Sequence, residues 1–329
     1  MNPYTGVNFF SFFLLLIKRG VAFASGSLSF DALASDEIQL LVLMGVSVSA
    51  ALLGTFLILR KQAMLANALS HTVLLGIVVM FLITNTFLLS IPLLMMGALI
   101  SGFLTTLLTD SLTKVGKLQE DASIGLVFSL LFALGILLVT LFARNVHLGV
   151  DLVMGNVDAL LRQDMGVVFY SLLFNGILLI LFYKEFLLTT FDPSLARSFG
   201  VSLFFFNSLM MVQTSITTVA AFRAVGVLLV LAFFTAPPLA ARLFVDSLKS
   251  LLALACLIGV MGSLIGVALS RHFFTSFGFG ISTGGVIVLV LGLFFLIGAL
   301  FAPARGILTQ KILRRKMTSK IAPSRTIDV

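Results

Sequence analysis

Nine long apolar segments follow one another along the chain, separated by short stretches that contain most of the charged residues. Each segment is close to the roughly 20 residues that a helix needs to cross the hydrocarbon core of a bilayer. The alternating pattern of a membrane β-barrel is absent, and lipid offers no hydrogen-bond partner to an open sheet edge. The pattern predicts an all-α, polytopic membrane protein with about nine transmembrane helices, at 38–59, 62–84, 87–109, 123–142, 166–183, 201–221, 225–244, 250–269 and 282–302.

The composition agrees with a lipid environment. Of the 329 residues, 60% are apolar and only 10% are charged, against roughly 25% charged residues in an ordinary soluble domain. A soluble protein of this size could not hide so much apolar surface in one core, and a disordered chain would be far more polar. Cys256 is the only cysteine, which excludes an intramolecular disulfide and a cysteine-cluster metal site.

The distribution of Lys and Arg predicts the orientation in the membrane. With nine spans the loops alternate between the two sides, and 15 of the 21 Lys and Arg residues then fall on one side. By the positive-inside rule this side is cytoplasmic, with the N-terminus outside and a basic cytoplasmic tail at 305–329. The net charge of +8 is thus mostly a topology signal, and no folded basic domain for nucleic acid is present.

Residues 1–37 precede the nine-helix transmembrane region, which we place at 38–304. The apolar stretch Phe9–Ile17 is too short to span a bilayer and is followed by two basic residues, which fits a secretory signal poorly. We interpret it as an interfacial helix on the outer face. Residues 25–37, which include Asp31, Asp36 and Glu37, are expected to form a polar linker on that face.

His71 is the ionisable residue that the prediction places deep inside a span. Asn67 precedes it by four residues, so both side chains leave one face of the helix. A buried histidine that bonds a neighbouring helix is the plainer interpretation, but a lone ionisable group in a membrane span more often marks a pathway. Imidazole is a good ligand for Mn²⁺, Fe²⁺ or Zn²⁺, and one His with one Asn leaves a metal site incomplete without a second chain.

A second candidate lies between the fifth and sixth spans, in residues 191–200 on the predicted cytoplasmic side. Asp192 can cap a helix that begins at Pro193, and Gly200 is suited to end it. The helix would cover 193–199, with Leu195 and Phe199 on one side. A well-capped loop explains the local pattern; the functional alternative is a docking helix for a cytoplasmic partner.

Other features are less specific. The paired prolines Pro237 and Pro238 interrupt backbone hydrogen bonding in a span and need protein or a cavity around them. A solvated outer loop is the expected place of His147, Asp151, Asp158 and Asp164, and His272 lies near the outer end of the eighth span. The sequence contains no phosphate-binding Gly-x-x-x-x-Gly-Lys-Ser/Thr motif, serine-hydrolase elbow or zinc-protease helix.

Four motifs in order resemble the permease subunits of ABC importers for manganese, zinc and iron over residues 40–304. They are Arg60-Lys61 with Ala68-Leu69-Ser70-His71, then Asp121-Ala122-Ser123-Ile124-Gly125, then Phe191-Asp192-Pro193 with Ala196 and Gly200, and last Val225-Gly226 with Leu229-Val230, Pro238 and Ala241. The resemblance implies a type II ABC importer-like permease that works as a dimer. It also implies two cytoplasmic ATPase subunits and an extracytoplasmic metal-binding protein, in a bacterial cytoplasmic membrane.

The resemblance also implies roles for single residues. In that family an Asp and a His of the second helix handle the metal; His71 matches the His, whereas Asn67 replaces the Asp. The 191–200 segment resembles the family's coupling segment, which contacts the ATPase. The divalent metal is then the transported substrate, no cofactor is tightly bound, and ATP is bound and hydrolysed on the partner rather than on this chain.

Three alternatives remain. A permease for a metal chelate such as a siderophore or cobalamin belongs to the same class of importer. A secondary transporter usually has acidic residues inside its spans, and the predicted spans contain none. An intramembrane enzyme centred on His71 would need a nucleophile or a metal triad, and the sequence offers neither beside it. Because Asn67 supplies no charge, we also expect a second, non-identical permease subunit that supplies a carboxylate.

Overall fold

The computed structural model describes residues 3–4, 6–27, 29, 32–84, 91–142, 157–278, 280–303, 306 and 309. Within these residues the regular structure is entirely helical, as expected. The elements are α1 (Phe9–Ala24), α2 (Ser35–Leu59), α3 (Ala63–Thr84), α4 (Ile91–Lys114), α5 (Glu120–Phe142), the 3₁₀ turn η2 (Val157–Ala159), α7 (Arg162–Leu181), α8 (Tyr183–Phe191), α9 (Pro193–Ser198), α10 (Leu203–Val225), α11 (Val227–Arg242), α12 (Leu248–Phe277) and α13 (Thr283–Phe301).

Each of the nine predicted spans falls on one helix. In the described part of the chain, seven helices are long and apolar enough to cross a membrane: α2, α3, α5, α7, α10, α12 and α13. α4 and α11 occupy the other two predicted spans. α11 has only 16 residues, which gives a length of about 24 Å against a hydrocarbon thickness of about 30 Å. The expected full-length span at 225–244 is therefore corrected to a shorter helix.

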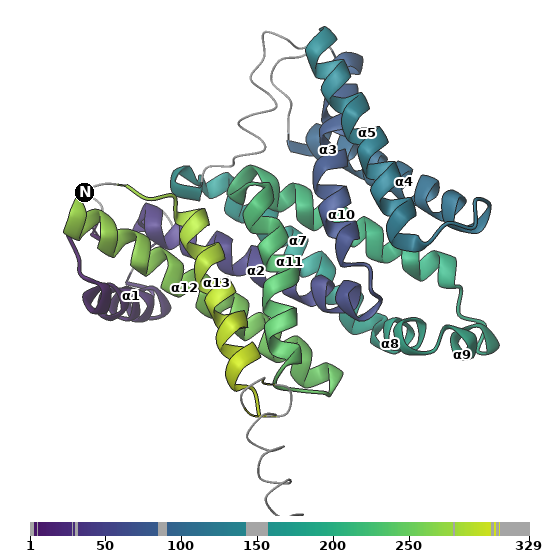
Figure 1. Ribbon diagram of the computed structural model, residues 1–329. Coiled ribbons are helices and arrows are strands. Elements are labelled where there is room, and N and C mark those ends of the chain that lie inside the picture. The colour runs from purple at the N-terminus through teal and green to yellow at the C-terminus, as the bar shows by residue number, and fades with distance from the viewer. Residues whose placement is uncertain are drawn as a thin grey trace, which may run out of the picture.

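The helices pack around α2. This helix contacts α7, α10, α11 and α12, while α3 packs against α4 and α5 to form a group that stands at one end of the molecule (Figure 1). α10 connects the two groups because it contacts both α2 and α4. The core is thus one continuous bundle with α2 and α10 at its centre.

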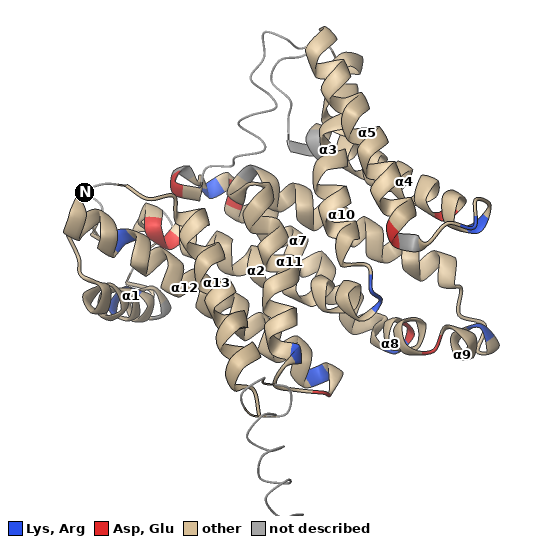
Figure 2. Ribbon diagram, in the orientation of Figure 1, with Lys and Arg blue, Asp and Glu red and all other residues tan. Residues whose placement is uncertain are grey.

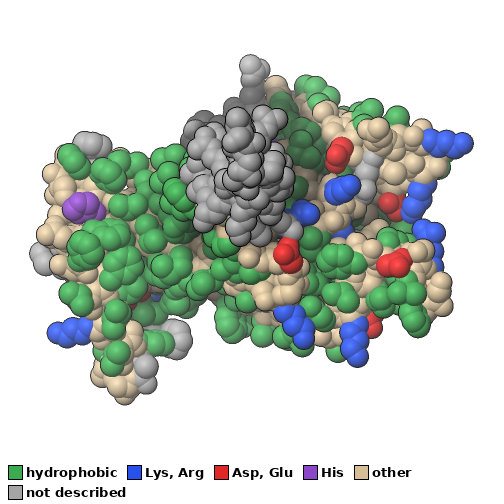
Figure 3. Space-filling view, turned by 60° about the horizontal axis from the view of Figure 1, so that its bottom comes forward, with side chains coloured by type: hydrophobic (Ala, Val, Ile, Leu, Met, Phe, Trp, Pro, Cys, Tyr) green, Lys and Arg blue, Asp and Glu red, His purple; other side chains and the backbone are tan. Residues whose placement is uncertain are grey.

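Charged residues lie at the helix ends and in the connections, whereas the middles of the long helices carry none (Figure 2). We call the end that carries Arg60, Lys114, Arg197 and Arg242 the basic end; these residues lie at or near the C-termini of α2, α4, α9 and α11. Figure 3 shows hydrophobic side chains over much of one face, with Lys and Arg gathered toward one side of it. This is the surface that a lipid bilayer stabilises.

The two prolines of α11 lie inside the helix and are buried, as their sequence context requires. Pro238 has no N–H, so the carbonyl of Phe234, four residues earlier, has no helical donor. Gly54 of α2 packs against this carbonyl: a Cβ at position 54 would lie 2.0 Å from the Phe234 oxygen. The close approach of two helices at this point depends on a residue without a side chain.

The N-terminal region differs from the expectation. α1 extends from Phe9 to Ala24, well beyond the predicted apolar stretch. Glu37 and Asp36, expected in a polar linker, lie in the first turn of α2 and are buried, which corrects that assignment.

Ion pairs explain why Asp36 and Glu37 are buried rather than exposed in a linker. Glu37 accepts hydrogen bonds from Arg19 of α1 and, at 2.9 Å, from the hydroxyl of Tyr4; Asp36 pairs with Arg271 of α12. Burial, followed by the hydrogen bond to Glu37, raises the pKa of Tyr4, so this phenol stays protonated at neutral pH.

Two acidic residues expected in a solvated loop are also structural. Asp164 lies in the first turn of α7, where its Oδ2 accepts the N–H of Leu161 at 2.9 Å and fixes the start of the helix. Asp158 accepts hydrogen bonds from Gln39 (3.1 Å) and Thr283 (2.6 Å), and so joins η2 to α2 and α13. The expectation for Asp164, which is buried, was wrong because hydropathy assigns a charged residue near a helix end to a loop, whereas Asp158 is exposed, as expected of a solvated position. His147 and Asp151 lie outside the described residues.

Candidate functional site

The site is built on α3, which begins after a tight turn at the basic end. Lys61 has a φ of 63°, and the N–H of Leu65 then reaches the carbonyl of Gln62 at 3.0 Å, which begins the helix. His71 follows Ala63 by eight residues, or about 12 Å along the axis. The structure therefore places His71 well inside the bundle, one turn beyond Asn67.

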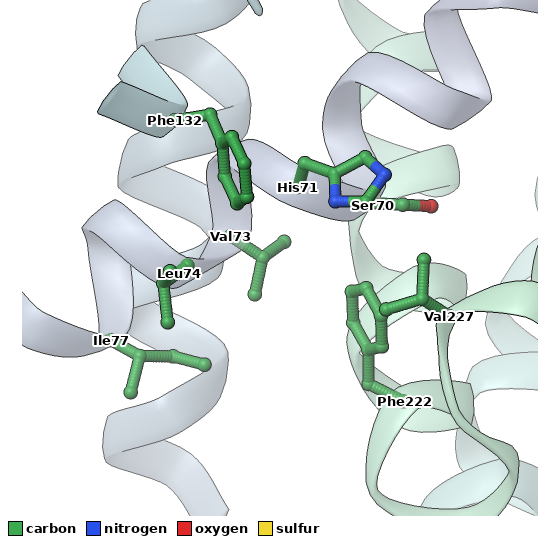
Figure 4. A pocket seen from close by; sticks show the side chains of 8 residues that line it. All are labelled: Ser70, His71, Val73, Leu74, Ile77, Phe132, Phe222 and Val227. Atoms are coloured by element: carbon green, nitrogen blue, oxygen red, sulfur yellow. The ribbon is translucent and has the colours of Figure 1, made fainter. Parts of the chain in front are cut away.

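His71 lines a small cavity where α3 faces the junction of α10 and α11. Five of the lining residues come from α3, Phe132 comes from α5, and Phe222 and Val227 face them from the junction (Figure 4). The cavity measures about 20 Å³, which is room for about one water molecule. Its walls are lined by Ser70, His71, Val73, Leu74, Ile77, Phe132, Phe222 and Val227.

The imidazole of His71 is held by aromatic rings. Its centroid lies 5.3 Å from that of Phe128 and 5.1 Å from that of Phe132, both on α5. Ser70, the other polar residue of the cavity wall, donates its hydroxyl to the carbonyl of Ala66 at 2.7 Å. His71 is thus the one strong metal ligand among the residues that line this cavity.

One imidazole does not make a metal site. The described residues contain no group of three or more His, Cys, Asp or Glu side chains that could hold a metal ion. Asn67 is half-buried on the same helix face and does not line the cavity. The structure therefore supports the position of His71 on an interior surface, while joint coordination by Asn67 and His71 stays a prediction.

The backbone break beside the cavity needs glycine. Gly226 separates α10 from α11 and has φ 80° and ψ 163°, a conformation that is essentially restricted to glycine. Its N–H donates to the carbonyl of Phe222 (3.0 Å), and its carbonyl accepts from Val230 (3.2 Å), so helical hydrogen bonding continues on both sides. The break places Phe222 and Val227, one on each side of it, against α3.

The predicted capped helix at the basic end is confirmed as α9. The carboxylate of Asp192 accepts the N–H groups of Ser194 (3.1 Å) and Leu195 (2.9 Å), and Pro193 is the first helical residue. Gly200 ends it with a φ of 76°. Ala196 is fully buried, whereas Leu195 and Phe199 are 42% and 69% exposed, which leaves an apolar surface for a partner.

The hydrogen bonds of Asp192 hold its pKa below the usual range. The hydroxyl of Ser194 is the main cause, followed by the N–H of Leu195. The cap is therefore ionised at neutral pH.

Arg60 connects this end of the molecule to the α2–α3 turn, a role that the sequence analysis missed. Its guanidinium donates to Thr190 (3.0 Å) and Thr189 (2.8 Å) of α8 and to Asn207 (2.7 Å) of α10. α8 and α10 flank α9, and Arg60 directly precedes the turn into α3. The hydrogen bonds of Arg60 thus connect the surroundings of α9 to the start of α3, the helix that carries His71.

The sequence analysis also missed a run of buried polar residues in the middle of α10. α10 has a mean hydropathy of 1.3 in its most apolar window, the lowest of the seven candidate spans. That low value is the signal in the sequence, and it comes from uncharged polar side chains rather than from ionisable ones. The residues are Gln213, Thr214, Ser215, Thr217 and Thr218, all at most 2% exposed. By contrast, His272 of α12 lies 3.5 Å from the hydroxyl of Ser276 and has a ring contact with Phe273, and it suggests no site.

Comparisons with known proteins agree with this geometry. A "Probable metal transport system membrane protein" of Chlamydia muridarum is 41% identical over 300 residues, which are 90% of this chain and 93% of the relative. The "Manganese transport system membrane protein MntD" of Bacillus subtilis is 38% identical over 280 residues, covering 81% of this chain and 92% of the relative.

The fold matches a solved structure. The structure of PsaBC from Streptococcus pneumoniae in complex with Fab superposes with a TM-score of 0.70 and 29% identity, covering 84% of this chain and 94% of that chain. This match confirms the expected fold class, that of an ABC importer-like permease. The sequence model of the ABC 3 transport family matches residues 37–302, almost all of the nine-helix region. The chain therefore belongs to the ABC 3 transport family and is a multi-pass membrane permease of the metal-transport type.

Proposed function

We propose that this chain is the transmembrane permease subunit of an ATP-driven importer for divalent transition-metal ions, namely Mn²⁺, Zn²⁺ or Fe²⁺. The observation that carries the proposal is the cavity of about 20 Å³ beside His71, at the α10–α11 break. Its size fits a bare or nearly bare cation, and its one strong ligand is an imidazole, which suits these metals. The metal is the transported substrate, and no tightly bound cofactor is needed.

The incomplete ligand set supports a second permease subunit. A divalent cation in a low-dielectric environment needs several ligands and compensating charge, and this chain offers one imidazole at the cavity. The subunit that completes the path supplies the remaining ligands. Because Asn67 has no charge, the partner that fits best is a non-identical permease with a carboxylate at the equivalent position.

The capped helix α9 supports a pair of ATPase subunits as further partners. Leu195 and Phe199 present apolar surface at the basic end, and such a surface suits a hydrophobic groove of a partner. ATP is bound and hydrolysed on these partner subunits. The basic end is then cytoplasmic, in a bacterial cytoplasmic membrane, with the N-terminus and an extracytoplasmic metal-binding protein on the opposite side.

Two alternatives have less support. A siderophore or cobalamin carries its metal already chelated, so it gives no reason for the imidazole that lines the cavity. A secondary transporter would use acidic residues inside the membrane for proton or sodium coupling; in the described helices Asp and Glu occur only near the ends, at Asp36, Glu37, Asp110, Glu120, Asp121, Asp164 and Glu185.

The test is transport by the purified complex in proteoliposomes. The chain is co-expressed with a candidate second permease and a candidate ATPase subunit, and uptake of manganese, zinc and iron ions is measured with and without ATP. We expect ATP-dependent accumulation of at least one of the three ions. Uptake that follows a proton or sodium gradient without ATP, or uptake of a chelate only, would overturn the proposal.

A further inference from the structure

Three polar side chains meet in the middle of the bundle, away from His71, where α10 faces α2 and α7, and a fourth lies one helical turn before them on α10. They are Ser49 of α2, Asn175 of α7, and Gln213 and Thr217 of α10, which we call the α10 polar cluster. All four are at most 2% exposed. Thr217 follows Gln213 by one helical turn, so both leave the same side of α10.

Part of the cluster is internally hydrogen-bonded. The Nδ2 of Asn175 lies 2.6 Å from both Ser49 Oγ and Thr217 Oγ1, and these two hydroxyls are 3.3 Å apart. Thr217 also donates to the carbonyl of Gln213 at 2.9 Å. The amide nitrogen of Asn175 thus joins three helices.

The rest of the cluster has no partner among the described groups. Both amide atoms of Gln213, Nε2 and Oε1, and the Oδ1 of Asn175 are buried without a hydrogen bond. A buried amide that loses water without gaining a partner destabilises the conformation that contains it, and an apolar residue of similar shape would be better tolerated. This conformation therefore gives no structural reason for a glutamine at position 213.

The connectivity of the chain shows how these atoms could become accessible. α7 continues into α8 and α9, and α9 is followed by α10, so Asn175 and Gln213 lie on the two long helices that flank the capped helix α9. Ser49 lies on α2, which is joined to α8 and α10 at the basic end through Arg60. A partner that displaces α9 would therefore act on both helices of the pair, directly on α10 and through α8 on α7.

We propose that Gln213 and Asn175 line the translocation path in a second conformation of the transport cycle, in which their free amide atoms meet water and the passing divalent cation. Neutral amide oxygens are hard donors that can replace water around such an ion, and the absence of a carboxylate keeps the binding weak enough for release. The inference rests on the proposed transport function, and it assigns a role to residues distinct from the His71 cavity.

The first experiment separates a transport role from a packing role. Gln213→Met keeps the approximate shape of the side chain and removes both free polar atoms. We expect ATP-dependent manganese uptake in proteoliposomes to fall at least tenfold, while the thermal stability of the purified complex stays equal or rises. Uptake within twofold of the parent would overturn the proposal, because the amide would then have no role in transport.

Thr214→Val is the matched control, because Thr214 is fully buried on the same helix and its hydroxyl already donates to the carbonyl of Met210 at 2.8 Å. This variant should transport at the parental rate. If both variants lose uptake equally, the effect belongs to α10 packing and the proposal fails.

The second experiment detects water at the cluster directly. Cys256 is the only cysteine, so Cys256→Ala gives a cysteine-free background, into which Gln213→Cys and Asn175→Cys are introduced separately. A charged, water-soluble methanethiosulfonate reagent is applied to the reconstituted complex without nucleotide and in the ATP–vanadate state. Ile216→Cys, on the half-buried side of α10, and Ala221→Cys, fully buried among apolar residues, are the controls.

We expect both cluster positions to react at least tenfold faster in one state than in the other, with the two controls at background in both states. Equal background labelling at positions 213 and 175 in both states would overturn the inference. If one of these variants does not assemble, Thr217→Cys replaces it under the same criteria. Failure of the parent to transport metal would contradict the proposed function instead, so the two failures are distinguishable.

Discussion

The surroundings of His71 favour a role in ligand binding over a role in helix packing. Two phenylalanine rings of α5 fix its orientation, and its ring lines a cavity of about 20 Å³ in an otherwise apolar wall. A histidine whose purpose was to hold helices together would bond a polar group of a neighbouring helix. In the described structure this imidazole has ring contacts instead, which favours a role toward a ligand.

We expect His71→Ala to abolish metal uptake while assembly and abundance stay near normal. His71→Phe should do the same, because it preserves packing against Phe128 and Phe132 but removes the metal ligand. The measurement is ATP-dependent uptake with quantification of the purified complex. His272→Ala is the control and should be silent. Parental uptake in either His71 variant would remove His71 from the path.

The limits of sequence reasoning are clearest at single residues. His71 could be found because it is ionisable and lies inside an apolar segment. Gln213 also lies inside an apolar segment, but an uncharged side chain in a span becomes a candidate only when the structure shows that it is buried without a hydrogen-bond partner. Arg60 was assigned to topology alone, since its three hydrogen-bond partners lie at least 129 positions away in the chain. Long-range contacts of this kind have no local signature.

At the scale of elements, helix existence was predictable and helix ends were not. Apolar length located a helix at each of the nine predicted positions, and seven of these helices are long and apolar enough to cross a membrane. The ends depend on capping and pairing: Asp164 begins α7 and Glu37 lies in the first turn of α2, yet hydropathy counts both as loop residues. α9 is the exception, because Asp192 and Pro193 form a recognisable start and Gly200 a recognisable end.

We expect Ala196→Trp to uncouple ATP hydrolysis from transport or to lose the ATPase during purification. Ala196 is fully buried, so an indole there must displace α9 from α8 and α10. The readouts are the stoichiometry of the purified complex and the ratio of metal transported to ATP hydrolysed. Gly200→Val should act similarly, since a β-branched residue strains at a φ of 76°. Lys184→Trp on exposed α8 surface is the control; coupled transport in the Ala196 variant would refute the docking role.

The lowered pKa of Asp192 predicts how the coupling of ATP hydrolysis to transport responds to pH. The pKa of Asp192 is lowered, first by the hydroxyl of Ser194, so the ionised cap stabilises the folded helix. This contribution is present above the unfolded pKa of about 3.9 and is lost as the pH falls through the lower folded value. Coupling should therefore be unaffected by this residue between about pH 5 and 8. Asp192→Asn keeps an N-cap acceptor and should remain coupled, whereas Asp192→Ala should not. The assignment would be contradicted if the coupling ratio of the parent changed across neutral pH while that of Asp192→Asn did not.

The contact between α2 and α11 predicts a stability effect. In Gly54→Ala the new methyl group would lie 2.0 Å from the Phe234 carbonyl oxygen, so the two helices must separate. We expect a loss of roughly 1–3 kcal/mol, the usual cost of overpacking, measured as a lower melting temperature in detergent. Gly125→Ala on α5 is the matched control, because a Cβ there meets no atom within 4 Å. An unchanged melting temperature in the Gly54 variant would show that this packing is loose.

At the scale of the whole molecule, the described helices form one bundle, and the cavity beside His71 offers a single strong metal ligand. Its helices bury their polar groups against one another, its surface is apolar where lipid would cover it, and its charges lie at the ends. Such a chain is suited to form part of a path whose remaining ligands come from another subunit. The sequence could predict this incompleteness by counting ligands, but it contains no information on the partner's residues.

The last prediction concerns that partner. Two copies of this chain would face a divalent cation with two imidazoles and two uncharged amides, since position 67 is Asn. A partner with Asp at the equivalent position adds a negative charge where removing water from the cation is costly. We therefore expect a heterodimer of two non-identical permeases, recovered by co-expression with the neighbouring permease gene and identified by native mass spectrometry. A homodimer that transports metal at the full rate would refute it. In that case Asn67→Asp becomes decisive: a large gain in apparent affinity would identify the amide as a weak ligand, and no change would remove position 67 from the path.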